Sequence, residues 1–446
     1  MGQRLPHGVP RPPQVADQPR WANWSGEQRC SPAAIEAPRS EAEVVEAVAR
    51  AAEAGRTVRV AGSGHSFSDL VCTDGHLLTL SAMAAVLDAD PSTGLVRVQG
   101  AVTLHDLGHA LAGLGLALEN QGDIDAQTLA GALATGTHGT GVRWANLSSQ
   151  VAAMRLVTGG GEVVELDASD PDGLRAARVS LGALGVVTEV VLRCVPAFTL
   201  ERVDEPRPLG EVLDGLDRLA DGADHFELWA FPYADRVMTR TSTRSARAPR
   251  SRNPRADWVK GHLENEALTL AGRLAGRVPR TVPRLNRAMM RLVTRDVVVD
   301  RSHRVYASRR DIRFTELEYA LPREQARTAI EGVLDLVARR RLPVAMPIEV
   351  RFVAADDAFL SPASGRATCY VAVHQHRGQP FEPYFRAAEE LLLGLGGRPH
   401  WGKRHWLGAE RLASRYPGWE AFAAVRDRLD PEGRFTNASL RRVLGR

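Results

Sequence analysis

The sequence predicts an α+β protein built from two large parts, and three observations support this prediction. The chain has 446 residues, 44% hydrophobic and 25% charged, which is typical of a globular protein with ample apolar material for a core. Short strands alternate with glycine-rich turns over residues 20–198. Longer helices alternate with strands over residues 199–398, the pattern of an antiparallel sheet covered by helices. Residues 1–19 are expected to form a flexible, proline-rich tail, and residues 399–446 a C-terminal segment.

The first part opens with a predicted helix, for which Ser40 is a suitable N-cap. Glu43 follows three residues later as in a capping box, and Gly55 ends the helix. A second helix is expected from Thr103 to about Leu114. The predicted strands are TVRVAG, LLTLSAM, LVRVQGAV, a hairpin in MRLVTGGGEVVEL, and SLGALGVVTEVVLRCV.

The second part has longer elements. REQARTAIEGVLDLVARRR is a predicted helix, and RFTELEYAL, PIEVRFVAA and TCYVAVHQH are predicted strands. In the C-terminal segment, YPGWEAFAAVRDRLD is a predicted helix that ends at Pro431.

Charge and cysteine content exclude several classes of protein. The 57 basic and 53 acidic residues give a formal charge of +4, far below that of a dedicated nucleic-acid binder. All basic residues are arginines except Lys260 and Lys403, so a lysine inside a motif merits attention. The four cysteines are widely spaced and predict reduced thiols in a cytoplasmic protein. The N-terminus lacks the apolar run of a signal peptide, and no stretch approaches a membrane span, so only peripheral membrane attachment is expected.

The first glycine motif is RVAGSGHSFSD. Gly62 and Gly64 allow the backbone to approach a ligand closely and to turn its N–H groups toward an anion, with His65 at the tip of the turn. A purely structural turn is the alternative. A Rossmann fingerprint is disfavoured because the third glycine is missing.

The second glycine motif is GALATGTHGTG, residues 131–141, which we expect to be a loop. Its glycines and threonines offer backbone and hydroxyl donors suited to a pyrophosphate. A single such stretch is more often structural. Two in one part of the chain favour an extended dinucleotide, which needs several separate donor sites.

Together these motifs resemble the PCMH-type FAD-binding domain of the vanillyl-alcohol oxidase superfamily. Within it, the chain is similar to the aldonolactone oxidoreductases, which act on L-gulono-, L-galactono- or D-arabinono-1,4-lactones, and especially to their bacterial L-gulono-1,4-lactone dehydrogenase type. WSGEQRCSP near the start, the EVRF strand and HWGK near the end are further landmarks, so the resemblance covers residues 20–446.

The resemblance implies a two-subdomain FAD domain over residues 20–198 and a substrate, or cap, domain over residues 199–398. Residues 399–446 would complete the active site with HWGK and pack back on the FAD domain. His65 would carry the flavin through a covalent 8α-histidyl bond. The residues that the resemblance assigns to FAD are Gly62, Ser63, Gly64, His65, Ser66, Gly122, Ala134, Thr135, Gly136, His138, Gly139, Thr140, Gly182, Gly185, Val186 and Val187.

Four residues are candidates for catalysis. Glu349 and Arg351 lie two apart on a predicted strand, so their side chains share one face. From the residues alone, the simpler interpretation is a surface ion pair. By resemblance, Glu349 instead binds substrate hydroxyls and Arg351 stabilises negative charge. Lys403 in HWGK, which could otherwise be a solvated lysine, supplies a fixed positive charge. His374 lines the pocket facing Glu349.

The implied activity is oxidation of a secondary alcohol on a sugar-1,4-lactone by hydride transfer to flavin, which gives ascorbate or its five-carbon analogue. The electron acceptor is O2, a cytochrome c or a quinone. Alanines at positions 132 and 134 favour a guarded flavin and therefore a dehydrogenase. The alternatives are an alditol oxidase that releases hydrogen peroxide and a non-catalytic FAD-binding protein. No nucleic-acid partner is expected.

Two further features are assigned weaker roles. TRTSTRSARAPRSRNPR, residues 239–255, holds six arginines and no acid, and it predicts a mobile loop that is either simply solvated or a docking site for an acidic acceptor or membrane. His105 and His109 share a helix face, but with no acid on that face and no third ligand, no metal site is predicted.

Overall fold

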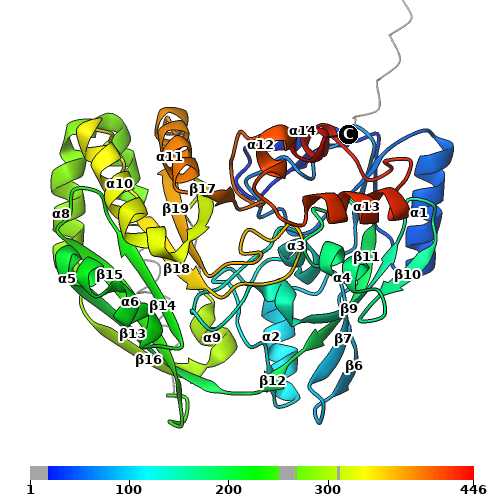
Figure 1. Ribbon diagram of the computed structural model, residues 1–446, viewed down its shortest axis with the longest axis horizontal. Coiled ribbons are helices and arrows are strands. Elements are labelled where there is room, and N and C mark those ends of the chain that lie inside the picture. Colours follow the sequence, from blue (N-terminus) through cyan, green and yellow to red (C-terminus); the bar gives the residue numbers. More distant parts are fainter. Residues whose placement is uncertain (1–18, 251–265, 267–268, 309–311, 446) are drawn as a thin grey trace, which may run out of the picture.

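The computed structural model describes residues 19–250, 266, 269–308 and 312–445, which form two halves side by side (Figure 1). The expected tail of residues 1–19 lies outside the described residues except for its last residue. The first half is an α+β unit and the second is an antiparallel sheet covered by helices, so the predicted fold class is confirmed. None of the described helices is both long and apolar enough to cross a membrane.

The first half contains two main sheets. A three-stranded parallel sheet has the order β3-β5-β4, and a five-stranded antiparallel sheet has the order β10-β9-β11-β7-β6. The strands of the main sheets are β3 (Ala34–Glu36), β4 (Val58–Ala61), β5 (His76–Thr79), β6 (Val86–Asp90), β7 (Leu95–Gln99), β9 (Val151–Val157), β10 (Val163–Leu166) and β11 (Val186–Arg193). Two small pairs join β1 (Trp21–Ala22) to β2 (Arg29–Cys30) and β8 (Leu116–Ala117) to β12 (Val195–Pro196).

The helices of this half follow the local signals of the sequence. In α1 (Glu41–Glu53) the Ser40 side chain accepts from the Glu43 N–H, as predicted, while the Glu43 carboxylate reaches back to the Arg39 N–H. The other helices are α2 (Leu104–Gly113), α3 (Leu129–Ala134), the 3-10 helix η1 (Leu147–Gln150) and α4 (Pro171–Arg178).

The second half is an eight-stranded sheet with the order β16-β13-β15-β14-β18-β19-β17-β20. Its strands are β13 (Thr199–Pro208), β14 (His225–Ala230), β15 (Arg236–Ser245), β16 (Asp296–Arg301), β17 (Phe314–Pro322), β18 (Ile348–Val353), β19 (Thr368–His376) and β20 (Arg398–Pro399). Its helices are α5 (Leu209–Asp214), α6 (Leu216–Asp221), η2 (Pro279–Thr281), α8 (Val282–Leu292), α9 (Ser302–Tyr306), η3 (Arg323–Gln325), α10 (Ala326–Arg339) and α11 (Glu382–Gly394).

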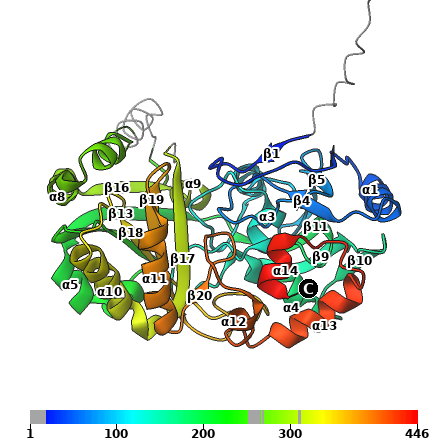
Figure 2. The same cartoon turned by 90° about the horizontal axis from the view of Figure 1, so that it is seen from above.

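The chain then returns to the first half through α12 (Ala409–Ala413), α13 (Trp419–Leu429) and α14 (Ala438–Leu444). Figure 2 shows α13 and α14 beside α4 and the five-stranded sheet. The Val58 N–H donates to the Arg434 carbonyl at 2.8 Å, and the Asn437 amide donates to the Leu70 carbonyl at 2.9 Å. The C-terminal segment therefore contacts the first half closely, whereas the exact domain boundaries stay predictions.

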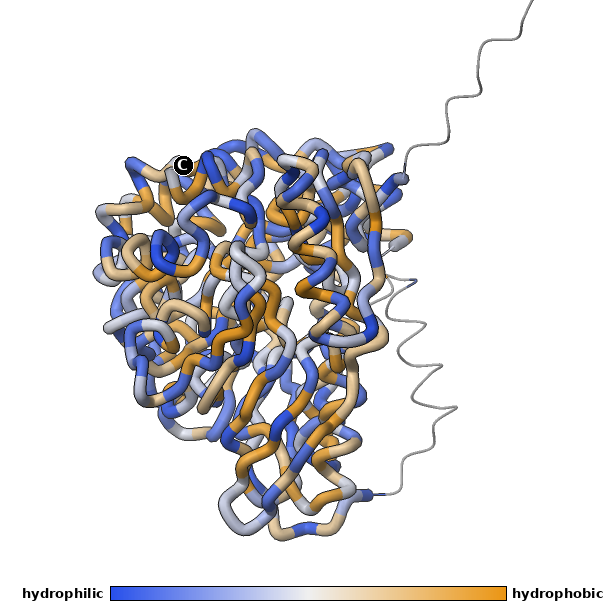
Figure 3. The backbone as a smooth tube through the Cα atoms, turned by 90° about the vertical axis from the view of Figure 1, so that its right-hand side faces the viewer, coloured by the Kyte–Doolittle hydropathy of each residue, from blue (hydrophilic) through white to orange (hydrophobic). Residues whose placement is uncertain are grey.

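The central strands of the large sheet alternate with period two, and this alternation builds the site. Leu317 and Tyr319 on β17 belong to the same buried apolar core as residues of α10 and α11, and so does Val350 on β18. The residues between them, such as Glu318 and Arg351, therefore project from the opposite face of the sheet. Figure 3 shows hydrophobic and hydrophilic residues alternating along much of the backbone. The sheet thus has one apolar face under helices and one polar face.

Two predictions of loops are wrong in part. Within residues 131–141 the first residues belong to α3, because Leu129, Ala132 and Leu133 are buried at helical spacing. Within residues 239–255, the stretch up to Ser245 is the second half of β15, where β-branched threonines favour a strand. Residues 251–255 lie outside the described part of the chain.

Candidate active site

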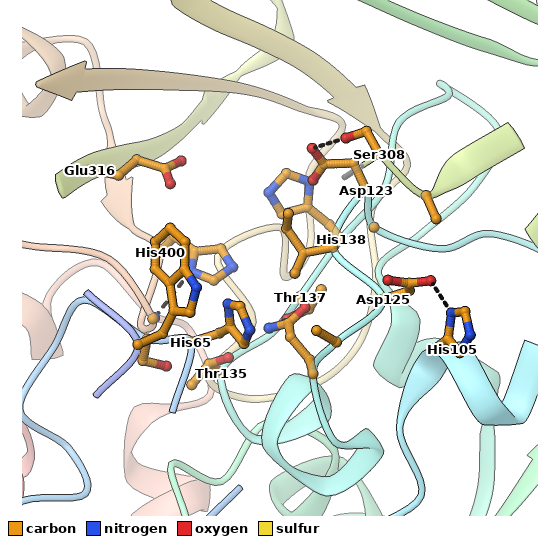
Figure 4. A pocket seen from close by; sticks show the side chains of 18 of the residues that line it. His65, His105, Asp123, Asp125, Thr135, Thr137, His138, Ser308, Glu316 and His400 are labelled. Atoms are coloured by element: carbon orange, nitrogen blue, oxygen red, sulfur yellow. Dashed lines mark hydrogen bonds and ion pairs between the residues drawn. The ribbon is translucent and has the colours of Figure 1, made fainter. Parts of the chain in front are cut away.

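A cavity of about 820 Å³ lies between the polar face of the large sheet and the first half of the chain. In Figure 4, Glu316 lies on the opposite side of it from His65, Thr135 and Thr137, with His138 and His400 between them. A second cavity of about 620 Å³ adjoins it, and the two share His65, Ser66, Gln127 and Thr135 in their walls. The site is therefore a two-part hollow with His65 at the junction.

The second cavity fits the dinucleotide that the glycine motifs predict. Its wall includes the turn over residues 62–66, and none of the backbone N–H groups of residues 63–66 donates to another described group. Gly64 has a φ of +68°, which glycine adopts without strain. The buried hydroxyl of Ser68 in the same wall also has no partner among the described residues. Such a row of unpaired donors suits a pyrophosphate.

Most of the predicted FAD residues line the two cavities. The turn 62–66, Ala134, Thr135, Gly182, Gly185 and Val187 line the second cavity, and Gly122 and His138 line the first. Four line neither cavity: Gly136, Gly139, Thr140 and Val186. Of the two alanines of the acceptor hypothesis, Ala134 lines the second cavity, whereas Ala132 is fully buried in the core.

Thr140 and Gly141 tie the second glycine motif to the large sheet. The Thr140 hydroxyl donates to the Phe226 carbonyl and accepts from the Phe352 N–H at 3.2 Å. The Gly141 N–H donates to the Phe352 carbonyl at 2.6 Å. This end of the motif therefore joins the two halves of the protein.

His65 is held in an aromatic environment at the junction. The ring of Trp24 stacks on it with centroids 5.3 Å apart and planes 22° apart, and Trp24 itself packs against Phe67 and Phe314. Burial, together with the positive charge of Lys403, lowers the pKa of His65. The imidazole is therefore favoured in its neutral form, which is the nucleophilic one.

Arg351 lies in the wall of the first cavity and is surrounded by three carboxylates. Its Nε donates to Glu227 at 2.8 Å, its Nη2 lies 3.2 Å from Asp123, and Glu349 on the same strand also pairs with it. Burial opposes its charge, but Asp123, Glu349 and Glu227 outweigh burial and raise the pKa of Arg351 well above its usual value. The guanidinium is thus a fixed, permanently charged group.

Glu349 and His374 lie behind this wall rather than in it. Glu349 contacts Arg351, and His374 donates through Nδ1 to the Pro347 carbonyl at 2.9 Å. The Nε2 atom of His374 lies 3.4 Å from Glu316 and 3.8 Å from Glu349. Burial lowers the pKa of His374, but Glu316 and Glu349 raise it by more, so its protonated form is favoured.

Lys403 is the second cation in the wall of the first cavity. Its Nζ donates to Glu316 at 2.5 Å and lies 4.0 Å from Glu318, above the ring of Phe67. Burial opposes the charge of both partners, yet their attraction raises the pKa of Lys403 above 10.5 and lowers the pKa of Glu316 to about 2. Lys403 is therefore held in place as an ammonium group.

Glu318 forms a second acidic centre with two histidines. His138 Nε2 lies 3.2 Å from it, while His138 Nδ1 donates to the Gly139 carbonyl at 2.8 Å. His138, Glu318 and His400 form the one group of three potential metal ligands found in the described residues. Because Lys403 already places a positive charge near Glu318, this group has a counter-charge without a metal ion.

Several site residues were not predicted from the sequence: Asp123, Glu227, Glu316, Glu318 and His400. The ELE sequence of β17 contains a usable signal, because two acids on one face of an otherwise apolar strand are costly unless that face is paired or solvated. The residues that face these acids from neighbouring strands could not be found from a local sequence pattern. Glu316 lies opposite His374, and Glu227 lies opposite Arg351, because of the strand register.

The rim of the first cavity carries three histidines. His105 and His109 have ring centroids 4.8 Å apart, and His303 follows at 4.9 Å from His109. An acid does adjoin this group, contrary to the appearance of the sequence: Asp125 lies 2.8 Å from His105. Burial lowers the pKa of His303 to about 4, so this ring stays neutral near neutral pH.

Comparisons with known proteins extend these observations. The family model described as D-arabinono-1,4-lactone oxidase matches residues 190–443, and the one described as FAD binding domain matches residues 32–167. The chain is 53% identical to the L-gulono-1,4-lactone dehydrogenase of Mycobacterium tuberculosis, over 96% of this chain and 99% of that protein. It is 34% identical to the L-gulonolactone oxidase of Bos taurus, over 95% and 98%.

Two further similarities place the chain more broadly. It is 32% identical to the alditol oxidase of a Streptomyces species, over 95% of this chain and 98% of that protein. The crystal structure of cholesterol oxidase from B. sterolicum superposes with a TM-score of 0.81 and 17% identity, over 98% of this chain and 100% of that chain. This last similarity concerns the fold alone.

Proposed function

Because the chain belongs to the D-arabinono-1,4-lactone oxidase family of FAD-dependent oxidoreductases, we propose that it oxidises a CH–OH group of a sugar-1,4-lactone. L-Gulono-1,4-lactone is the first substrate to test, and L-galactono- and D-arabinono-1,4-lactone are the related ones. With the six-carbon lactones the 2-keto product tautomerises to ascorbate.

One observation carries the proposal: two cations, the buried Arg351 and the partly buried Lys403, line the cavity that adjoins the FAD cradle. When bound there, FAD would supply the redox chemistry by accepting the hydride of the substrate carbinol. The protein must then stabilise the negative charge that develops on the substrate oxygen as this oxygen loses its proton. Two fixed positive charges do this, because they need no reorganisation as negative charge develops.

The other polar residues would position these two cations and the substrate. Glu349 would act with Glu227 and Asp123 to fix the plane of Arg351 from behind the cavity wall. His374 would hold Glu316, and Glu316 would hold Lys403. Glu318 and His400 line the cavity and would accept or donate hydrogen bonds to the hydroxyls of a lactone.

Replacing Glu316 by glutamine is expected to move the alkaline limb of the kcat profile to lower pH. Glu316 raises the pKa of Lys403, so in the native protein the ammonium persists beyond the ordinary pKa of 10.5. Without the Glu316 carboxylate, the effect of burial on the pKa of Lys403 is opposed mainly by Glu318 and Asp123, so the amine deprotonates at lower pH. The pH dependence of kcat from neutral to about pH 10 measures this shift.

Glu390→Gln, which removes an exposed acid on α11, is the control and should leave the profile unchanged. An identical profile for Glu316→Gln and the native enzyme would contradict the assignment of Lys403 as the charged group.

The ion pair of Glu316 and Lys403 also stabilises the folded protein, and the direction of each pKa shift decides the pH range in which it does so. The carboxylate contributes above pH 4.5 and fades as the pH falls toward 2, and the ammonium contributes below pH 10.5 and fades above it.

We further propose that FAD is linked covalently through His65. The neutral imidazole, its stacking on Trp24 and its place at the junction of the cavities support this linkage. His65→Ala is expected to abolish attachment while leaving reversible FAD binding, because the cradle is otherwise intact. Acid precipitation measures it: the yellow colour should stay with the native pellet and move to the supernatant for the variant.

His105→Ala is the matched control, since this exposed histidine lines the same cavity at its rim. A native pellet without flavin would contradict the covalent linkage but would leave FAD binding and lactone oxidation untouched. Retention of flavin by the His65→Ala pellet would place the bond on another residue.

The electron acceptor is proposed to be a cytochrome c or a quinone rather than O2. The similarity to a dehydrogenase and the place of Ala134 in the cofactor cavity support this choice. The decisive experiment for the whole proposal is turnover of the purified FAD-loaded protein with the three lactones, with O2 or cytochrome c as acceptor. No turnover of any lactone with either acceptor would refute it.

Polyol oxidation is the second candidate, and the 32% identity to an alditol oxidase supports it. An open-chain polyol has the same secondary alcohol groups but no lactone carbonyl. Turnover of xylitol or sorbitol with release of hydrogen peroxide, and none of the lactones, would select this activity.

A further inference from the structure

A strongly basic surface covers the far end of the large sheet. The segment 267–295 contains no acidic residue and seven arginines: Arg273, Arg277, Arg280, Arg284, Arg287, Arg291 and Arg295. The segment therefore carries a formal charge of +7, while the whole chain carries only +4. The rest of the chain is net negative, so positive charge is concentrated here. We call these seven residues the arginine face.

Two helices carry five of the seven arginines and turn them toward solvent. In α8 the exposed residues, Arg284, Arg287, Ala288, Arg291 and Leu292, recur at helical spacing, while Val282, Asn286 and Met290 are buried on the opposite side. In the helix over residues 269–277, Leu270, Arg273, Leu274 and Arg277 are exposed, while Ala271, Gly272 and Ala275 are buried. Figure 1 shows α8 at the outer edge of the second half.

The same faces expose large apolar side chains. Leu292 is 81% exposed, Leu270 65%, Val278 46% and Leu274 38%. These are four of the nine large hydrophobic residues that are exposed in the described part of the chain. Exposed leucines interleaved with arginines are unusual for a helix that faces water, where carboxylates normally accompany the basic residues.

This surface is held firmly rather than left loose. Asn286, fully buried in α8, donates to the Pro232 carbonyl at 2.9 Å and to the Val344 carbonyl at 3.0 Å. The first helix packs so closely that a Cβ on Gly272 would lie 2.6 Å from the ring of His376. The leucines are therefore kept outside by the anchoring of the opposite faces.

Among the described residues, the seven arginines also have no acidic partner. No carboxylate among the described residues pairs with any of the seven, and the one hydrogen bond from this set joins Arg287 to the Tyr233 carbonyl. Elsewhere the chain pairs its arginines extensively, as with Arg97 and Arg155 on the five-stranded sheet. The charge of the arginine face is therefore available to an external anion.

We propose that the arginine face binds the surface of an anionic lipid bilayer. Phosphate headgroups would pair with the arginines, and Leu270, Val278 and Leu292 would enter the boundary between headgroups and acyl chains. A nucleic acid would satisfy the arginines but would leave the leucines in water, and for this reason a bilayer is the better match. The proposal goes beyond lactone oxidation, because it concerns where the enzyme works.

Partitioning of the FAD-loaded protein onto lipid vesicles tests the proposal. We expect binding to phosphatidylcholine vesicles that contain roughly a third phosphatidylglycerol, and weak binding to phosphatidylcholine alone. Each arginine near such a surface contributes about fivefold, so Arg277→Gln/Arg284→Gln/Arg291→Gln should lower partitioning roughly 100-fold. High salt should weaken native binding by screening.

Two further variants make the outcome decisive. Arg56→Gln/Arg218→Gln/Arg340→Gln removes three exposed arginines elsewhere and should bind like the native protein. Leu292→Ser should lower partitioning severalfold without changing its salt dependence, because only insertion into lipid uses this side chain. All variants should oxidise substrate normally with a soluble acceptor.

Three results would overturn the proposal: no binding of the native protein to anionic vesicles, equal losses in the two triple variants, or unchanged binding of Leu292→Ser. The last result would indicate an acidic macromolecule instead of a bilayer.

Discussion

Replacing Arg351 by methionine is expected to lower the kcat for lactone oxidation by roughly 100- to 1,000-fold. Its guanidinium is a buried, permanent positive charge in the wall of the proposed substrate cavity. Methionine preserves much of the volume but supplies neither charge nor donors. The substrate oxygen would then lose its proton beside Asp123, Glu227 and Glu349, whose negative charges oppose that step.

Steady-state kinetics with L-gulono-1,4-lactone measures the loss. Arg351→Lys is the matched control, because it keeps the charge but loses the planar fork that contacts several carboxylates at once, and an intermediate loss is expected. Removing a buried cation also strains the fold, so flavin content and Tm must be compared with the native protein. A folded, flavin-loaded Arg351→Met enzyme with kcat within about threefold of the native value would contradict the catalytic role.

Replacing Lys403 by methionine is expected to lower kcat by about 100-fold or more, with a smaller change in KM. Lys403 is paired with Glu316 and lies 4.0 Å from Glu318, so its loss leaves two buried carboxylates in the cavity wall without their cation. The charge acts mainly as the alkoxide develops, which is why kcat should fall more than substrate affinity. Single-turnover reduction of the bound flavin by lactone measures the chemical step directly.

A small external amine provides the control for Lys403. Ethylammonium added to a Lys403→Ala variant should restore part of the activity, since alanine vacates the space of the side chain beside Glu316. The same amine should not affect Arg351→Met. Full activity of Lys403→Met, or equal stimulation of Lys403→Ala and Arg351→Met by the amine, would contradict the role assigned to this lysine. Because Lys403 also lowers the pKa of His65, flavin attachment should be measured in parallel.

Local structure was predictable wherever neighbouring residues decide it. The capping of α1 by Ser40 and the hairpin of β9 and β10 follow from short-range signals, and the structure has both. The same-face arrangement of Glu349 and Arg351 follows from strand geometry alone, and the salt bridge between them agrees with it.

Residues that meet through strand register could not be predicted. Glu227 comes to Arg351 because β14 pairs with β18 in one register, and Glu316 comes to His374 because β17 pairs with β19. A shift of one residue would turn either acid to the apolar face, and no local pattern fixes that choice. Asp123 belongs to a loop, where side-chain direction depends on distant contacts.

The two misassigned loops failed for a related reason. Glycine and arginine content dominated the reading of residues 131–141 and 239–255. In the structure, burial of Leu129 and Leu133 supports a helix, and Arg240 is paired with Asp204 and Glu227 inside a strand. Tertiary contacts supplied the partners that composition alone could not show.

The bonds of Thr140 and Gly141 to Phe226 and Phe352 have a mechanical consequence. They join the cofactor-side loop directly to the backbones of β14 and β18, the strands that carry Glu227 and Arg351. The distance between the flavin and the substrate is thus fixed by backbone hydrogen bonds close to Glu227 and Arg351, and not by a hinge between the two halves. A displacement of β14 or β18 is therefore transmitted to the cofactor-side loop, because no flexible segment between them can absorb it.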